Sequence, residues 1–267
     1  MYSSDNEKEK VSLELAKALG IKKIASGAAE HLLEAAIKKI EDEKTDRDVF
    51  QKELAGYSDE ELKLYIPDVY QKDIYKIDYS KLKENGIKLI SFDIDDTITD
   101  TFINKVGANI PGGKVPMPDD AKELFKKLKF MGFTVTLLTN SEANLASEVC
   151  KQLKADGYIS RANKPSTMNF EIMQQQYGVE KAQMAHVGNS MRTDIWGGNN
   201  FGITTCLVRR KGFAMRLVIF IGKKIGLPTK GKLIRNKLVE RGLWRKHHLK
   251  EKGDQYYQLG EKPKYRR

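Results

Sequence analysis

The sequence is poor in cysteine and histidine, and this limits the kinds of site it can build. Its 267 residues include two cysteines, Cys150 and Cys206, and four histidines, without the spacing of a disulfide framework or a zinc site. We therefore expect neither a disulfide-stabilised secreted fold nor a structural zinc centre. A reducing cytosol fits this cysteine usage best.

The sequence also lacks a long apolar run. The longest covers the six residues 217–222, whereas a membrane-spanning helix needs about 20. The acidic residues near the start, Asp5, Glu7 and Glu9, are unlike the basic and apolar segments of a signal or transit peptide. We expect a cytoplasmic protein. Its basic tail also suggests peripheral contact with the inner face of the membrane.

Positive charge is abundant but confined to one end of the chain. The formal net charge is +11, yet residues 209–267 hold 19 Lys and Arg against four Asp and Glu, a net of +15. Residues 1–208 therefore carry a net of −4. The basic character belongs to the tail and suggests an anionic partner there.

The chain divides into four regions by composition and periodicity. Apolar residues at helical spacing within 11–40 predict a helical N-terminal extension over 1–55. It could dock on the core, bind a partner helix or lie on a membrane, and local packing of its apolar stripe is the favoured interpretation. Residues 56–86 have no clean period and predict an irregular lead-in, 87–210 form the core, and 211–267 form a basic amphipathic tail.

Apolar strands alternate with amphipathic helices from residue 87 onward. The expected strands are 87–93, 133–139, 157–160, 184–188 and 203–208. The helical stripes between them are Ala121, Leu124, Phe125 and Leu128; Leu145, Val149 and Leu153; and Phe170, Met173 and Tyr177, which stops at Gly178. This alternation predicts an α/β fold with a parallel sheet of about five strands and helices on both faces.

The densest group of acids follows the first of these strands. In 89–100, LISFDIDDTITD, an apolar run leads to Asp93, Asp95 and Asp96. Two such charges about 4 Å apart repel by about 4 kcal/mol at an effective dielectric of 20, so a cation is expected among them. Alternation places Asp93 and Asp95 on one side, at the edge where α/β sheets bind ligands. A simple Asp-rich turn is the alternative.

Each of the first four strands ends in residues that suit phosphoryl chemistry. They are Asp93, Asp95 and Thr97 after the first; Thr139, Asn140 and Ser141 after the second; Lys164 after the third; and Gly188, Asn189 and Asp194 after the fourth. Any one of them could be an ordinary turn or loop residue. Together, at successive strand ends, they predict a site that handles phosphate.

These motifs resemble those of the haloacid dehalogenase (HAD) superfamily of aspartate-nucleophile phosphatases, over about 87–210. Three segments further resemble its YqeG group of subclass III phosphatases, which is related to the mitochondrial-type phosphatidylglycerophosphatases. The segments are YIPDVYQKDIYKIDYSKLKENGIK at 65–88, N-K-P at 163–165 and TDIWGGNNFGITTCLV at 193–208. The resemblance implies a Rossmann-like core and a Mg²⁺-dependent phosphoric monoester hydrolase.

The resemblance also implies a catalytic role for four residues. Asp93 would attack phosphorus and form an aspartyl-phosphate. Asp95 would act as general acid toward the leaving oxygen and then as general base toward water. Thr139 and Lys164 would stabilise the phosphoryl oxygens as they gain charge.

Substrate and metal contacts follow from the same resemblance. The residues expected to contact the substrate are Thr97, Asn140 and Ser141, and those expected to hold Mg²⁺ are Asp93, Asp95 through its backbone carbonyl, Asn189 and Asp194. Asn189 departs from the family pattern, which has an aspartate there. An amide brings no charge, so the affinity for the metal should fall unless Asp194 compensates. The alternative function is therefore a catalytically weakened HAD-fold scaffold that binds RNA, ribosomes or membranes through its basic tail.

The motif spacing leaves no room for a large cap domain. About 20 residues, 98–117, remain for a flap, and 140–163 is filled by one helix and one short strand. An open site suits a phosphate on a large or surface-bound substrate.

The tail carries an apolar stripe flanked by basic residues, as in an interfacial helix. The stripe consists of Ala214, Leu217, Val218, Ile221 and Ile225. We expect a phospholipid-type substrate such as phosphatidylglycerophosphate, with peripheral contact to an anionic membrane. A helix packed on the core and a basic arm for RNA are the alternatives. Nucleic acid is the less favoured partner, but no sequence motif in the tail separates lipid from RNA.

Overall fold

The structure is a computed structural model that describes five segments of the chain. The described residues are 46–100, 115, 117–209, 229–244 and 256–261. The helices predicted within 11–40 and the apolar stripe from Ala214 to Ile225 lie outside the described residues, as does most of the predicted flap.

The chain divides into two compact units. The first comprises residues 1–53 and 213–230, of which only 46–53 and 229–230 are described. The second comprises residues 54–212 and 231–267.

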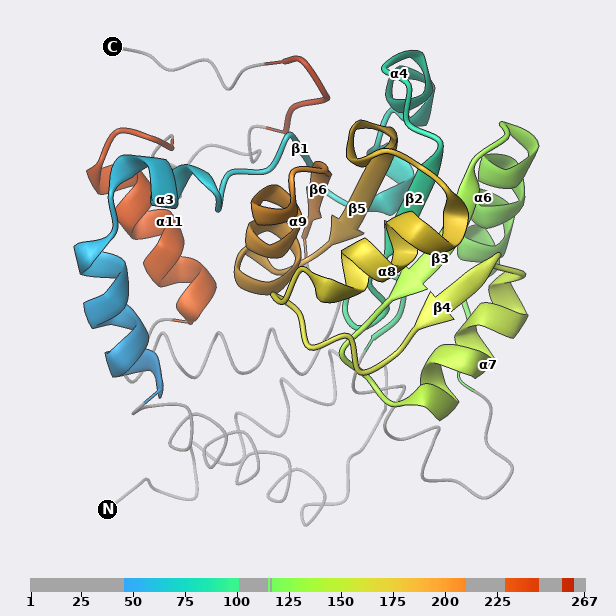
Figure 1. The fold of residues 1–267 in the computed structure, drawn as a ribbon, viewed down its shortest axis with the longest axis horizontal. Helices are drawn as coiled ribbons and strands as arrows, with labels where there is room; N and C mark the ends of the chain where they lie inside the picture. The colour runs from blue at the N-terminus through green and yellow to red at the C-terminus, as the bar shows by residue number, and fades with distance from the viewer. Residues whose placement is uncertain (1–45, 101–114, 116, 210–228, 245–255, 262–267) are drawn as a thin grey trace, which may run out of the picture. The chain divides into compact units, whose positions relative to one another are not determined.

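The second unit is built on a six-stranded sheet in the order β1-β6-β5-β2-β3-β4 (Figure 1). The strands are β1 (Val69–Gln71), β2 (Leu89–Phe92), β3 (Thr134–Leu138), β4 (Gly157–Ile159), β5 (Met184–Gly188) and β6 (Thr204–Val208). Every pair of neighbours runs parallel. The predicted α/β fold with a parallel sheet is therefore confirmed, and all five expected strands are present.

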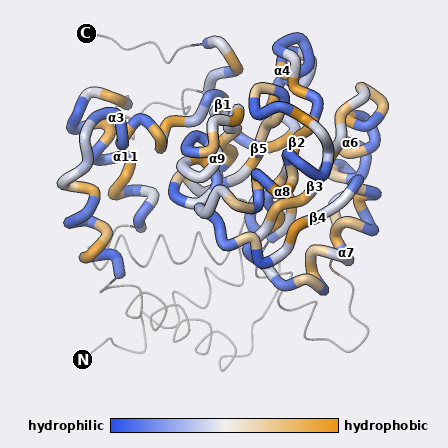
Figure 2. The backbone as a smooth tube through the Cα atoms, in the orientation of Figure 1, coloured by the Kyte–Doolittle hydropathy of each residue, from blue (hydrophilic) through white to orange (hydrophobic). Residues whose placement is uncertain are grey.

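Helices cover both faces of the sheet, as the buried residues of the two faces show. One face packs against α4 (Tyr79–Glu84), α6 (Asp119–Phe130) and α7 (Ala143–Leu153). The other packs against α8 (Met168–Tyr177) and α9 (Trp196–Phe201), which lie in front of the sheet in Figure 1. Figure 2 shows hydrophobic and hydrophilic residues alternating along α6 and α7, the pattern of helices with one buried side.

Two of these helices are followed by a glycine in the left-handed conformation. Gly178 follows α8 with a φ of 60° and closes that helix, as expected from the sequence. Gly132 follows the end of α6 with a φ of 86°. These turns return the chain to β5 and β3.

The prediction that residues 56–86 form an irregular lead-in was wrong. This segment contains α3 (Asp59–Lys63), the edge strand β1, a 3₁₀ turn (Ile74–Lys76) and α4. The three residues of β1 are all buried, so no alternation of polar and apolar residues marks them as a strand. Pairing with β6 identifies β1, a long-range contact that local periodicity does not encode.

Two parts of the basic tail pack within this unit. Helix α11 (Lys230–Glu240) buries Leu233, Ile234 and Leu238. Farther along, Tyr257 forms an antiparallel bridge to Tyr70 of β1, with backbone N–H···O distances of 2.9 and 3.0 Å. The tail is therefore not wholly separate from the core, and the domain boundaries stay a prediction. No helix among the described residues is long and apolar enough to cross a membrane.

Tyr257 provides a test of this packing. Its ring is 6% exposed, lies 6.3 Å from the ring centres of Tyr70 and Trp244, and its hydroxyl donates to the Pro67 carbonyl at 2.7 Å. We expect Tyr257→Ala to lower the free energy of unfolding by about 3 kcal/mol in urea denaturation. Phe130→Ala, at a side chain that is 93% exposed, is the control and should change it little. Equal effects of the two substitutions would contradict the packing of the tail.

Candidate active site

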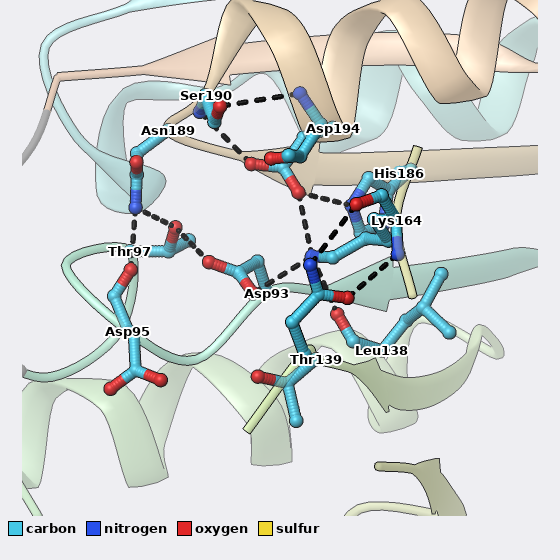
Figure 3. Close-up of polar contacts among 12 residues, drawn as sticks. Asp93, Asp95, Thr97, Leu138, Thr139, Lys164, His186, Asn189, Ser190 and Asp194 are labelled. Carbon is cyan, nitrogen blue, oxygen red and sulfur yellow. Dashed lines mark hydrogen bonds and ion pairs between the residues drawn. The ribbon is translucent and has the colours of Figure 1, made fainter. Parts of the chain in front are cut away.

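The predicted site residues gather at one edge of the sheet. Asp93 follows β2, Thr139 follows β3, Lys164 lies in the loop after β4, and Asn189 follows β5. Because these strands are parallel neighbours, their carboxyl ends meet at the same edge. Figure 3 shows these residues turned toward one another, with Lys164 at the centre.

Asp93 sits at the start of a tight loop. Its backbone N–H donates to the Val187 carbonyl at 2.9 Å, which extends the β2–β5 pairing by one residue. The loop then turns back on itself, since the Ile94 carbonyl accepts from the N–H of Ile98 at 3.0 Å and Asp96 adopts a φ of 59°. This turn brings the Thr97 hydroxyl back to Asp93, where it donates to Oδ2 at 3.2 Å.

Lys164 is buried and uses all three of its N–H donors. Its ammonium lies 2.8 Å from Oδ1 of Asp93, 2.6 Å from Oδ1 of Asp194 and 2.9 Å from the Leu138 carbonyl. Burial alone would lower the pKa of Lys164, but Asp194 and Asp93 outweigh it and the pKa is raised. The charged lysine therefore joins two carboxylates that would otherwise repel each other.

The two carboxylates differ in their affinity for a proton. Burial raises the pKa of Asp93 to about 6, against the attraction of Lys164 and with a contribution from Asp194. Burial would raise the pKa of Asp194 as well, but Lys164 and His186 hold it below its usual range. Asp194 thus acts as the fixed counter-ion of Lys164, and Asp93 keeps the more basic oxygens.

Asn140 holds the loop that carries Lys164. Its side-chain oxygen accepts from the Lys164 N–H at 2.7 Å, and its side-chain nitrogen donates to the Lys164 carbonyl at 3.1 Å. The Lys164–Pro165 peptide is cis. The structure therefore gives Asn140, expected to contact substrate, a place in positioning the lysine loop.

Asp95 and Ser141 pair with each other. The Ser141 hydroxyl donates to the Asp95 carboxylate, and the Ser141 N–H donates to the Thr139 hydroxyl at 3.2 Å. Figure 3 shows the Asp95 carboxylate pointing away from Lys164. The expected roles of Asp95 as acid and base, and of Thr139 and Ser141 toward substrate, stay predictions.

Asn189 lies against the loop that follows Asp93. Its amide nitrogen donates to the backbone carbonyl of Asp95 and, at 3.0 Å, to the Thr97 hydroxyl. Because the two ends of an amide have nearly the same size, a half-turn of the group would present its oxygen instead. After such a half-turn, the Asn189 oxygen would join the Asp93 carboxylate and the Asp95 carbonyl in one small region.

These oxygens fit a hard divalent cation by their chemistry. Magnesium binds through one or two carboxylates completed by other oxygens and water, and Asp93 supplies the one carboxylate. Among the described residues, no three His, Cys, Asp or Glu side chains form a metal site. The donor set is therefore compatible with Mg²⁺ but poorer in charge than a site with two or more acids.

Asp194 has a different set of partners from the one expected of a metal ligand. It is 1% exposed, its Oδ1 accepts from Lys164 and lies 3.3 Å from Nε2 of His186, and its Oδ2 accepts from the Ser190 N–H at 2.9 Å. A Cβ atom at Gly188 would lie 2.3 Å from its carboxyl carbon, so glycine is required there. Its role toward a metal stays a prediction.

His186 was missed in the sequence because it has no neighbours at metal-ligand spacing. It lies within β5, fully buried, and contacts Ser91 of β2 on one side and Asp194 on the other. One signal was present: an ionisable residue inside an apolar strand, two positions before the Gly188-Asn189 motif. Buried ionisable groups beside a site are candidates for function.

Comparisons with known proteins agree with this picture. A family model described as "HAD-hyrolase-like" matches residues 161–216. The chain is 27% identical over 146 residues to "Probable phosphatase YqeG" of Bacillus subtilis (strain 168), covering 55% of this chain and 78% of that protein.

Solved structures with partial similarity were also found. An uncharacterized protein from Listeria monocytogenes serotype 4b is 20% identical, with a TM-score of 0.37 over 45% of this chain and 76% of the other. The 3-deoxy-D-manno-octulosonate 8-phosphate phosphatase of Moraxella catarrhalis, in complex with magnesium ion, phosphate ion and KDO, is 13% identical, with a TM-score of 0.37 over 54% of this chain and 91% of the other.

The motifs at successive strand ends, the family model and the similarity to YqeG agree with one another. The chain is similar to the HAD-like hydrolases over residues 161–216 and to the phosphatase YqeG over 146 residues.

Proposed function

We propose that this protein is a phosphoric monoester hydrolase that transfers the phosphoryl group of its substrate to Asp93 and then to water. The observation that carries the proposal is the buried Asp93–Lys164–Asp194 arrangement. It presents one basic carboxylate next to a fixed positive charge, at the edge of the sheet where ligands bind. The similarity to "Probable phosphatase YqeG" supports the same reaction class.

In the first step, an oxygen of Asp93 forms a bond to phosphorus as the bond from phosphorus to the ester oxygen breaks. Each Asp93 oxygen accepts one hydrogen bond, from Lys164 or from Thr97, and so keeps a lone pair for attack. Asp95 acts as the general acid and gives a proton to the leaving oxygen. The products are an alcohol and an aspartyl-phosphate.

In the second step, water attacks the aspartyl-phosphate at phosphorus. Asp95, now ionised, takes a proton from the water, and the bond between phosphorus and the Asp93 oxygen breaks. Inorganic phosphate leaves and Asp93 is regenerated. For both steps the Asp95 side chain must leave its contact with Ser141 and turn toward the phosphoryl group.

Lys164 and Thr139 act on the oxygens of the transferring phosphoryl group. Lys164 contributes a full positive charge from a buried position, where a charge has a stronger effect than in water. Mg²⁺ held by Asp93, the Asp95 carbonyl and Asn189 would neutralise further negative charge on the phosphoryl oxygens.

Asp93→Asn tests the proposal. The amide keeps the shape of the side chain but removes its nucleophilic oxygen, so phosphate release from an aryl phosphate in Mg²⁺ buffer should fall by at least about 1,000-fold. Asp119→Asn, at an exposed position in α6, is the matched control and should keep wild-type turnover. Turnover that survives Asp93→Asn would show that Asp93 is not the nucleophile.

A second candidate function is a weakly catalytic scaffold, and Asn189 favours it. The Asn189 amide brings no charge to the cation, and its nitrogen already bonds to the Asp95 carbonyl. Under this alternative the fold serves binding, and hydrolysis is slow because the metal is held weakly.

Asn189→Asp separates the two candidates. A second carboxylate should tighten Mg²⁺ binding by about tenfold or more, roughly 1.4 kcal/mol, in calorimetric titration of the free protein. If the protein is a scaffold, phosphatase turnover should also rise sharply in this variant. A wild type that already turns over at ordinary phosphatase rates, with little gain from Asn189→Asp, would contradict the scaffold. Asn85→Asp, at an exposed position at the end of α4, is the charge control and should change neither Mg²⁺ binding nor turnover.

The substrate class we propose is a phospholipid-type phosphomonoester such as phosphatidylglycerophosphate. The motif spacing without a large cap, the basic apolar tail and the resemblance to a group related to phosphatidylglycerophosphatases support it. A panel of phosphomonoesters should show the highest kcat/KM for the lipid substrate presented in mixed micelles. A clear preference for small soluble phosphates, with no gain from the lipid, would contradict the lipid assignment and leave the hydrolase proposal intact.

A further inference from the structure

We propose that His186 is a positioning residue of this site, which holds the Asp194 carboxylate so that Lys164 is directed at Asp93. The proposal rests on a chain of buried hydrogen bonds that runs from Ser91 through His186 and Asp194 to Lys164. Its kinetic consequence depends on the proposed hydrolase function, whereas the hydrogen-bond chain itself does not.

The sheet register creates the first contact of the chain. Ser91 of β2 and His186 of β5 are directly paired neighbours, and the Ser91 hydroxyl lies 2.9 Å from Nδ1 of His186. Both side chains are fully buried, so water cannot replace either partner. Phe170 of α8 packs against the imidazole in an edge-on arrangement, with ring centres 5.2 Å apart, and restricts its rotation.

The partners of His186 define which nitrogen carries its proton. Nε2 lies 3.3 Å from Oδ1 of Asp194, and an ionised carboxylate only accepts hydrogen bonds. Nε2 must therefore donate. Nδ1 of a neutral ring is then the acceptor for the Ser91 hydroxyl, at 2.9 Å, nearer than the Ala185 carbonyl at 3.4 Å. Burial lowers the pKa of His186, which agrees with a neutral ring.

The donor from His186 completes the environment of Asp194. Its Oδ1 accepts hydrogen bonds from His186 and Lys164, and its Oδ2 accepts one from the Ser190 N–H. Both oxygens of the carboxylate are therefore held in place. Lys164 is in turn held by Asp194 and by the Leu138 carbonyl, and its remaining N–H points at Asp93. A change in the orientation of Asp194 would therefore change the direction of Lys164.

His186 contacts none of the reacting groups, so its effect must pass through Asp194. Removing its donor would leave a buried carboxylate with one hydrogen bond fewer and a less fixed orientation. Misplacement of a catalytic group by about 1 Å can cost about 100-fold in rate. We therefore expect a loss in kcat with little change in KM.

Two matched substitutions of His186 isolate the effect of its Nε2–H donor on catalysis. His186→Gln places an amide N–H the same number of bonds from the backbone as Nε2, and His186→Met places a methyl group there, while both remove the ring that contacts Phe170. Relative to His186→Gln, we expect His186→Met to have a kcat about 10- to 100-fold lower, a KM within about threefold, and a similar thermal midpoint. Thr136→Val, a buried substitution on the same face outside the site, should leave kcat unchanged.

Nitrogen-15 NMR of histidine-labelled full-length protein tests the chain without any activity. Wild type should show His186 as a neutral ring protonated at Nε2. Ser91→Ala should shift the Nδ1 resonance, because it removes the hydrogen bond there, while Nε2 stays protonated. A ring protonated at Nδ1 in wild type, or equal kcat values for the folded Met and Gln variants, would overturn the proposal. A wild type without turnover would sink the hydrolase function instead, and the NMR result would then decide whether the chain exists.

Discussion

The structure depends on one buried cation, the ammonium group of Lys164, which lies between the carboxylates of Asp93 and Asp194. Without it, two acids at the centre of a sheet edge would repel each other in a medium that screens charge poorly. With it, Asp194 is a stable counter-ion and Asp93 retains basic oxygens. The site is thus prepared for an incoming phosphoryl group by a charge balance internal to the protein.

The parallel sheet makes this arrangement possible from residues far apart in the sequence. Asp93 and Lys164 are separated by 71 positions and meet because β2, β3 and β4 are neighbours. Short polar contacts then fix the loops at the strand ends, as when Asn140 holds the backbone of Lys164 at both its N–H and its carbonyl. Residues expected to touch substrate therefore also build the loops that carry the central lysine.

Much of the fold was predictable because its signals are local. The strands β2 to β6 are apolar runs, and α8 ends at a glycine in the left-handed conformation. The edge strand β1 was not predictable from periodicity, since all three of its residues are buried. The motif residues were predicted from the sequence, but their hydrogen-bond partners were not. Ser141 bonds to Asp95, and His186 lies against Asp194. These contacts depend on the register of neighbouring strands, which the sequence does not show.

The most direct test of the central claim is to find the phosphoryl group on Asp93. The protein should be quenched during turnover of an aryl phosphate and treated with borohydride, which reduces an acyl phosphate to an alcohol. Tandem mass spectrometry should then find homoserine in place of Asp93, and only when substrate was present. Homoserine at another acid, or unmodified Asp93 under conditions in which phosphate is released, would contradict the account.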